Sequence, residues 1–154
     1  MTGFDEQFVE LHRAAYRVAY KLLGDRAEAE DMAQEALARA LVRWRAVEPY
    51  AAAWVSRVSA NLALDRLRRL RHTIEVQEAV QLDPDTAQRL DLQRALLALS
   101  RRQRDVVVLR YLVDLPEQAV ADALGVSTGS VKTHASRGLA ALRQLLGEPL
   151  GSEA

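Results

Sequence analysis

Residues 130–137 bring hydrogen-bonding and positively charged side chains to one face of a predicted helix. This face comprises Ser130, Lys132, Thr133, His134, Ser136 and Arg137. The surrounding stretch, residues 127–147, contains no aspartate or glutamate. Side chains of these types can contact base edges and phosphates in the major groove of DNA. The alternative is a helical hairpin whose polar face is simply solvated, but the agreement of turn, caps and polar face favours DNA binding.

Two helices joined by a tight turn are predicted to position this face. Asp114 and Glu117 have the spacing of a capping box, with Pro116 in the first turn of the first helix. Gly125 supplies the turn, because a positive φ is cheap only for glycine, and Ser127 caps the second helix. The apolar positions that would pack the two helices together are Val120, Ala121 and Leu124, then Val131, Ala135, Leu139 and Leu142. This pattern predicts a helix-turn-helix.

The composition limits the fold and excludes several classes of protein. Of the 154 residues, 49% are hydrophobic and 5% are aromatic, which favours helix packing over a sheet. Cysteine is absent, so we expect no disulfide framework, thiolate nucleophile or cysteine-based zinc site. No stretch approaches the roughly eighteen apolar residues of a membrane span, and the N-terminus lacks a charged-then-apolar leader. We therefore expect a cytoplasmic protein with no membrane partner.

The formal net charge is zero, but the charges are sorted along the chain. Basic residues gather at Arg57, Arg66, Arg68, Arg69 and Arg71, and again at Arg101, Arg102, Arg104 and Arg110. Acidic residues gather at Asp25, Glu28, Glu30, Asp31 and Glu35, and again at Glu75, Glu78, Asp83, Asp85 and Asp91. The separation predicts one surface for a polyanion and another for a basic partner. Scattered solubilising charge, the alternative, would mix the two signs more evenly.

Helices are predicted along most of the chain. The first ends at Gly24, and a capping box of Asp25 and Glu28 opens a second that runs to about Trp44. Residues 45–50 are predicted to form a loop, and a third helix spans about 52–70. The faces expected to be buried are Phe8, Leu11, Ala15, Val18, Ala19, Leu22 and Leu23; then Ala29, Met32, Ala33, Ala36, Ala40 and Leu41; then Trp54, Val55, Val58, Leu62 and Leu67.

Periodicity fades through an acidic stretch that contains Pro84, which indicates a linker. Order resumes near Leu92, and Ser100 with Gln103 forms a third capping box. No strand pattern or internal repeat competes with helix. The sequence therefore predicts an all-α protein of two small helical domains, at 5–71 and 92–147, joined by a flexible linker at 72–91.

Groups that could support catalysis or bind a metal are sparse. The three histidines are far apart, and no glycine-rich phosphate loop is present. Glu28, Asp31 and Glu35 share a helix face, so a carboxylate metal site is conceivable there. That face has no nearby histidine, and acidic helix faces are usually just solvated. We expect no cofactor, metal or catalytic residue, and favour docking of this face onto a basic helix.

Four blocks of sequence, taken in order, resemble the extracytoplasmic-function (ECF) group of bacterial sigma factors. They are residues 24–36 (GDRAEAEDMAQEA), the Ala-Trp pair at 53–54 leading to residues 61–66 (NLALDR), residues 100–111 (SRRQRDVVVLRY), and the helix-turn-helix. The resemblance covers nearly the whole chain. It implies a subunit that directs RNA polymerase to promoters and has no enzymatic activity of its own.

The resemblance also implies roles for particular residues. Asp31, Gln34 and Glu35 would dock on the β′ clamp helices of the core polymerase, whose β flap is a further contact. Strand opening and capture of the −10 element would fall to the loop at about 45–52 and to one helix face, which carries Arg57, Asn61, Asp65, Arg68 and Arg69. The −35 element would be contacted by the face at 130–137. Many relatives are controlled by an anti-sigma factor.

The chain departs from the family pattern at His134 and at Leu37. His134 stands where many relatives carry arginine, so the −35 sequence preference does not carry over. Leu37 replaces a frequent aromatic residue in the helix that docks on polymerase. Two other functions fit part of the pattern: a free-standing dimeric helix-turn-helix regulator, which leaves the acidic face unexplained, and a helical adaptor, which leaves the acid-free helix unexplained.

Overall fold

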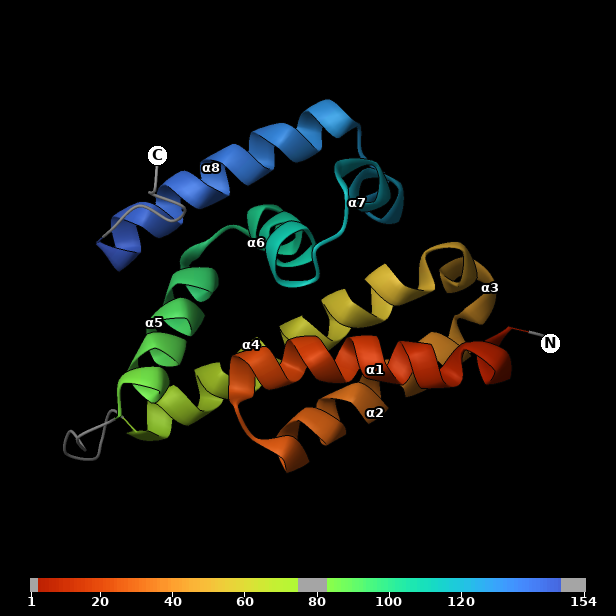
Figure 1. The fold of residues 1–154 in the computed structure, drawn as a ribbon, viewed down its shortest axis with the longest axis horizontal. Helices are drawn as coiled ribbons and strands as arrows, with labels where there is room; N and C mark the ends of the chain where they lie inside the picture. Colours follow the sequence, from red (N-terminus) through yellow and green to blue (C-terminus); the bar gives the residue numbers. More distant parts are fainter. Residues whose placement is uncertain (1–2, 75–82, 148–154) are drawn as a thin grey trace.

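The computed structural model describes residues 3–74 and 83–147, without the side chains of residues 71–74. Every regular element in these ranges is helical, so the predicted all-α fold is confirmed. The helices form two groups: α1, α2 and α4 in one, and α5, α6, α7 and α8 in the other, with α5 also in contact with α1 and α4 (Figure 1). Residues 75–82 of the predicted linker, including Glu75 and Glu78, lie outside the described residues.

The first group is a bundle of α1 (Phe4–Leu23), α2 (Arg26–Val42) and α4 (Ala51–Ile74), which pack against one another in pairs. A short helix α3 (Trp44–Val47) and a 3-10 turn η1 (Glu48–Tyr50) connect α2 to α4. The predicted loop at 45–50 is therefore wrong. Trp44 and Val47 are each 2% exposed and join the bundle core, which holds this connection in helical form.

Helix ends in the first group follow the predicted capping. Gly24 ends α1 in the left-handed conformation, with φ of 67°. The Asp25 carboxylate accepts a hydrogen bond from the Glu28 N–H at 2.9 Å and caps α2. The expected burial is wrong at Phe8 and Leu41, which are 43% and 49% exposed. Phe8 stacks on the His12 ring instead of entering the core, and Leu41 lies in the last turn of α2.

The second group begins with α5 (Pro84–Ala98), capped by Asp83, inside the stretch that the sequence assigned to the linker. It continues with α6 (Arg101–Val107), which Ser100 caps as predicted by accepting from the Gln103 N–H at 3.2 Å. A π-helical turn, η2 (Val108–Leu112), extends α6.

The helix-turn-helix consists of α7 (Glu117–Leu124) and α8 (Thr128–Leu146). Gly125 has a φ of 69° in the turn, and the Ser127 hydroxyl accepts from the Ser130 N–H at 3.0 Å, so both predictions are confirmed. The predicted capping box of Asp114 and Glu117 is wrong. Asp114 has a φ of 62° in the turn after η2, and Pro116 holds the N-cap position of α7 with no side-chain cap.

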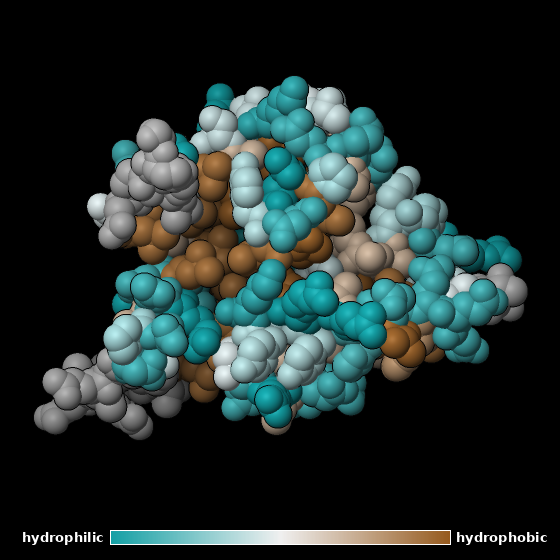
Figure 2. Space-filling view, viewed as in Figure 1, coloured by the Kyte–Doolittle hydropathy of each residue, from teal (hydrophilic) through white to brown (hydrophobic). Residues whose placement is uncertain are grey.

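The two groups of helices share buried apolar side chains. One cluster joins Val18, Leu22 and Leu64 of the first group to Leu96, Val108 and Leu142 of the second. Figure 2 shows apolar residues along the seam between the two groups, bordered by hydrophilic side chains. No helix in the described part of the chain is long and apolar enough to cross a membrane.

Gly138 lies within α8, where this helix packs closely on α6. A Cβ at this position would lie 2.7 Å from Val107 Cγ2. Gly138→Ala is therefore expected to lower the free energy of unfolding by about 1–3 kcal/mol, because overpacking outweighs the better helix propensity of alanine. Denaturant unfolding followed by circular dichroism measures the change.

Gly129→Ala is the matched control on the same helix. Its Cβ would meet only Ser127 Oγ, at 3.8 Å, so this substitution is expected to raise the free energy of unfolding by up to about 1 kcal/mol. Stabilisation by both substitutions would contradict the close approach of α6 and α8.

Candidate nucleic-acid interface

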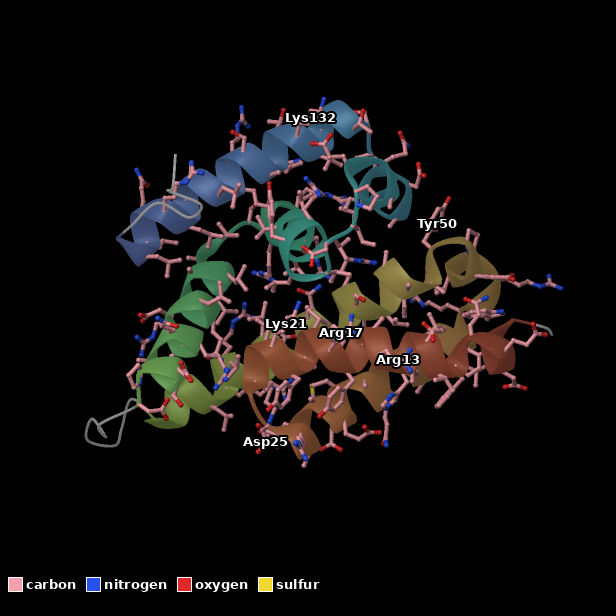
Figure 3. All side chains as sticks on the ribbon, in the orientation of Figure 1. Arg13, Arg17, Lys21, Asp25, Tyr50 and Lys132 are labelled. Atoms are coloured by element: carbon pink, nitrogen blue, oxygen red, sulfur yellow. The ribbon has the colours of Figure 1, made fainter. Side chains whose placement is uncertain are left out.

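The predicted DNA-contacting face lies on the outer side of α8. Lys132, Thr133, Ser136 and Arg137 are exposed there, and Ser130 and His134 are half-buried. Figure 3 shows Lys132 on the outer surface of this helix, away from the first group. Lys132 Nζ lies 3.9 Å from Glu117 Oε1, an exposed pair that leaves the ammonium accessible. The helix therefore presents cations and hydroxyls along one accessible face.

Two residues of this face turn a polar atom toward the protein. The Thr133 hydroxyl donates to the Gly129 carbonyl at 3.1 Å, one turn back along α8. His134 Nδ1 is buried and has no hydrogen-bond partner among the described residues. Its ring therefore turns one nitrogen toward the protein.

The recognition face is held in place by the crossing of α7 and α8. Val120 and Val131 are fully buried, and both belong to one core cluster with Ala121 and Ala135. The left-handed Gly125 reverses the chain between the two helices. This packing turns the polar face of α8 outward, as a major-groove helix requires.

The second predicted nucleic-acid face, on α4, is exposed at one end and half-buried at the other. Asp65, Arg68 and Arg69 are exposed, and Arg68 Nη1 lies 3.5 Å from Asp65 Oδ1. Arg57 and Asn61 are half-buried and face the second group of helices. These two side chains contact the Asp105 carboxylate of α6, at 3.7 Å and 3.3 Å.

A cationic groove lies beside this part of α4. A cavity of about 670 Å³ between α2 and α4 is lined by Arg39, Arg43, Trp54, Arg57 and Arg101, and by one acid, Glu35, which pairs with Arg39. Half-buried Trp54 and several guanidinium groups suit single-stranded nucleic acid, in which bases stack and phosphates need cations.

This groove was not predicted from the sequence. The apolar pattern predicts an inward Trp54, and Arg39 and Arg43 follow the acidic run at helical spacing. That spacing was the one available signal, because the approach of Arg101 from α6 depends on tertiary packing.

A smaller cavity of about 260 Å³ continues the groove along α4 toward the start of α6. Asn61, Asp65, Arg101 and Arg104 are among the residues that line it. Burial lowers the pKa of the Arg104 guanidinium, and the positive charge of Arg68 lowers that pKa further. Cations from both groups of helices are therefore crowded along this groove.

The acidic face of α2 lies on the surface, as its predicted docking role requires. Asp31, Gln34 and Glu35 are all exposed. Glu35 Oε2 accepts from Arg39 Nε at 2.9 Å, and Gln34 Nε2 donates to Glu30 Oε2 at 2.9 Å. Hydrogen bonds from His12 and then Gln34 hold the pKa of the Glu30 carboxyl below its usual range.

Exposed apolar residues continue this acidic face toward the end of α2. Leu41 is 49% exposed and Val42 is 84% exposed. Together with Asp31, Gln34 and Glu35 they form a mixed surface that we call the α2 ridge. Charge beside exposed apolar area is typical of a protein-docking surface. The described residues contain no group of three or more metal-binding side chains, on this ridge or elsewhere.

Comparison with known protein families covers both groups of helices. Sigma-70 region 2 matches residues 8–73, and Sigma-70 region 4 matches residues 89–142. The chain is 35% identical to the RNA polymerase sigma-E factor of Streptomyces coelicolor, over 93% of this chain and 85% of the relative. It is 31% identical to the ECF RNA polymerase sigma factor SigW of Bacillus subtilis, over 85% of this chain and 82% of the relative.

The chain belongs to the ECF sigma factors. Another member, the ECF RNA polymerase sigma factor SigM of Mycobacterium tuberculosis, is 35% identical over 94% of this chain and 78% of the relative. Among solved structures, the fold resembles the sigma factor RpoE of Bartonella quintana, which was crystallised in complex with the anti-sigma factor NepR. That likeness has a TM-score of 0.56 and 22% identity, and covers 96% of this chain and 98% of the other.

Proposed function

We propose that this sigma factor binds core RNA polymerase, recognises promoters, and opens the DNA strands to start transcription. One observation carries the proposal: two accessible surfaces of different chemistry lie on separate groups of helices. The α2 ridge carries acidic and apolar side chains, and the outer face of α8 carries Lys132 and Arg137 without any acid. Two such surfaces suit a protein that joins a polymerase to duplex DNA.

We assign polymerase docking to the first of two domains, at 5–71. Asp31, Gln34 and Glu35 would meet the β′ clamp helices. The second domain, at 92–147, would contact the β flap, and residues 72–91 would join the two domains. Bond formation belongs to the polymerase, so no catalytic residue is assigned. The protein would act in the bacterial cytoplasm, where the polymerase and the chromosome lie.

We assign promoter contacts to two helices. The face of α8, with Ser130, Lys132, Thr133, His134, Ser136 and Arg137, would contact the −35 element. Residues Arg57, Asn61, Asp65, Arg68 and Arg69 of α4 would hold the −10 strand. An anti-sigma factor would be a further partner, by analogy with RpoE of Bartonella quintana and its complex with NepR.

In vitro transcription tests this function. Core polymerase, a pool of genomic DNA and the purified protein are combined, and the start sites are sequenced. Starts that depend on the protein and share upstream elements are expected. Pull-down of core polymerase separates this function from the other two, because neither a free-standing regulator nor a helical adaptor would need to bind it.

Asn61→Ala is expected to leave promoter docking intact but to reduce strand opening several-fold. The Asn61 carboxamide can hydrogen-bond a base only after that base has left the duplex. Removing the carboxamide should therefore reduce strand opening and not the initial binding of duplex DNA. Permanganate reactivity of unpaired thymines measures the opening. Gln88→Ala removes an exposed carboxamide from α5 and is the control. Equal opening by the Asn61→Ala variant and the unsubstituted protein would remove Asn61 from this role.

A further inference from the structure

Three polar side chains form a connected network across the contact between α1 and α2. His12 lies on α1 and Glu30 on α2, and Figure 1 shows these two helices side by side. His12 Nε2 lies 2.9 Å from Glu30 Oε2, and Gln34 Nε2 donates to the same oxygen, also at 2.9 Å. One carboxylate oxygen therefore binds a histidine of α1 and a glutamine that belongs to the α2 ridge.

The His12 ring is itself held in a column of aromatic rings along α1. Rings recur at every fourth position of this helix, and residues four apart lie above one another. They are Phe8, His12, Tyr16 and Tyr20. The His12 ring stacks on Phe8 with 6.2 Å between ring centroids, and on Tyr16 with 6.1 Å. With a neighbouring ring on each face, the imidazole keeps the orientation that brings Nε2 to Glu30.

The charge of Glu30 fixes which atoms of its two partners face it. The pKa of this carboxyl is lowered, first by the His12 hydrogen bond and then by that of Gln34, so the group is an anion at neutral pH. A carboxylate can only accept, and it therefore takes the Nε2–H of the imidazole and the NH2 group of the carboxamide. A carboxamide that turned its oxygen to Glu30 would place two acceptors in contact.

This arrangement turns the carbonyl oxygen of Gln34 away from Glu30, because the oxygen and the nitrogen of a carboxamide point in different directions. Gln34 is exposed, so its oxygen is available to a donor outside the chain. Asp31 and Glu35, its neighbours on the α2 ridge, are also exposed and present only acceptor oxygens. The three side chains together offer a set of acceptors, which suits a partner that presents lysine or arginine.

We propose that His12 and Glu30 are positioning residues for polymerase docking, which hold the Gln34 carboxamide with its oxygen outward as an acceptor for a cationic group of core polymerase. The inference rests on the proposed function and deepens it, because it concerns how the same docking surface is prepared. A carboxamide that is already oriented loses less side-chain entropy on binding than one that rotates freely. It also does not present its NH2 group to a basic partner.

A double-mutant cycle of Glu30 and Gln34 tests the proposal, with the affinity for core polymerase as the measurement. Glu30→Ala removes a charge as well as an acceptor, and a basic partner would sense that charge directly. The cost of the lost charge is the same with and without Gln34, so it cancels when the two backgrounds are compared. Glu30→Ala is expected to weaken binding about fivefold more when Gln34 is present than in the Gln34→Ala variant, which is the size of one hydrogen bond's contribution.

Glu10→Ala is the matched control, because the exposed Glu10 carboxylate pairs with Arg13 and not with Gln34. Its cost should be equal in the two backgrounds. If Glu30→Ala also cost the same in both, or if Gln34→Ala cost nothing, the inference would be overturned.

Nuclear magnetic resonance of the free protein gives a second measurement that needs no polymerase. His12→Phe keeps a ring in the column and removes the donor to Glu30. The pKa of the Glu30 carboxyl should rise towards its usual range in this variant, because the His12 hydrogen bond is the largest cause of its lowering. In Glu30→Ala, hydrogen exchange of the Gln34 NH2 group should become faster, since its acceptor is lost. The inference fails if either the pKa or the exchange stays unchanged.

Transcription with core polymerase separates failure of this inference from failure of the proposed function. Suppose the unsubstituted protein binds core and starts transcripts, while the cycle gives equal costs in the two backgrounds. The positioning role is then rejected and the proposed function stands. Absence of both binding and transcripts with the unsubstituted protein would reject the proposed function, and this inference with it.

Discussion

Replacing Asp31 and Glu35 together by lysine is expected to abolish binding of core polymerase, with a loss of at least about a hundredfold in affinity. Each reversal places a cation where the partner is expected to be basic, and like charges at an interface cost several kcal/mol. Co-purification with tagged core, followed by a binding titration, measures the loss. Transcription from every promoter of this sigma factor should fall with it.

The loss of binding should reflect the interface with core polymerase and not unfolding, because both side chains are exposed. Among the described residues, the substitution removes the exposed Glu35–Arg39 ion pair, worth about 0.3–0.5 kcal/mol. Replacing Asp85 and Asp91 by lysine makes the same change in net charge on α5 and is the matched control. If the Asp31 and Glu35 double variant still bound core normally, the docking surface would have to lie elsewhere.

Replacing Lys132 and Arg137 together by alanine is expected to weaken binding to −35 duplex DNA and to flatten its dependence on salt. Each lost phosphate contact lowers the slope of log K against log salt by about 0.9, so the double variant should lose about 1.8. Fluorescence anisotropy at several salt concentrations gives the slope. At low salt the loss of affinity should be largest, because release of counterions contributes most there.

The control removes two cations from the first group of helices, at Arg17 on α1 and Arg26 on α2. Both are exposed, and Figure 3 shows Arg17 on α1, away from α8. This variant should keep the slope of the unsubstituted protein. Equal slopes for all three proteins would show that Lys132 and Arg137 do not contact phosphates.

Local sequence predicted the helix ends that depend on neighbouring residues. Gly24, Asp25, Ser100 and Ser127 each act within a few residues of their partners, and the structure confirms all four. The prediction at Asp114 was wrong although its spacing was as good. Asp114 itself adopts the left-handed conformation directly after the π-helical extension of α6, and neither feature is visible in the capping pattern.

Burial was predicted well within helices that pack on one core, and poorly at helix ends and in short connections. Ala29, Ala33, Ala36 and Ala40 of α2 are buried as expected, but Leu41, in the last turn of the same helix, is exposed. The Glu48-Pro49 pair favours a loop at residues 45–50, whereas buried Trp44 and Val47 hold this segment in helical form. Whether a residue at a helix end or in a short connection is buried depends on which neighbouring helices pack against it.

The sequence by itself determined the helical class, most helix ends, the helix-turn-helix and the likeness to a sigma factor. All of these depend on residue types at short, fixed spacings. Tertiary structure alone decided that Asp105 meets Arg57 and Asn61, and that Arg101 approaches the groove beside Trp54. Asn61 and Asp105 are 44 residues apart, and their contact arises only because apolar faces of the two groups pack together. No local pattern encodes that pairing, since burial of apolar area is non-directional and shape complementarity selects the partners.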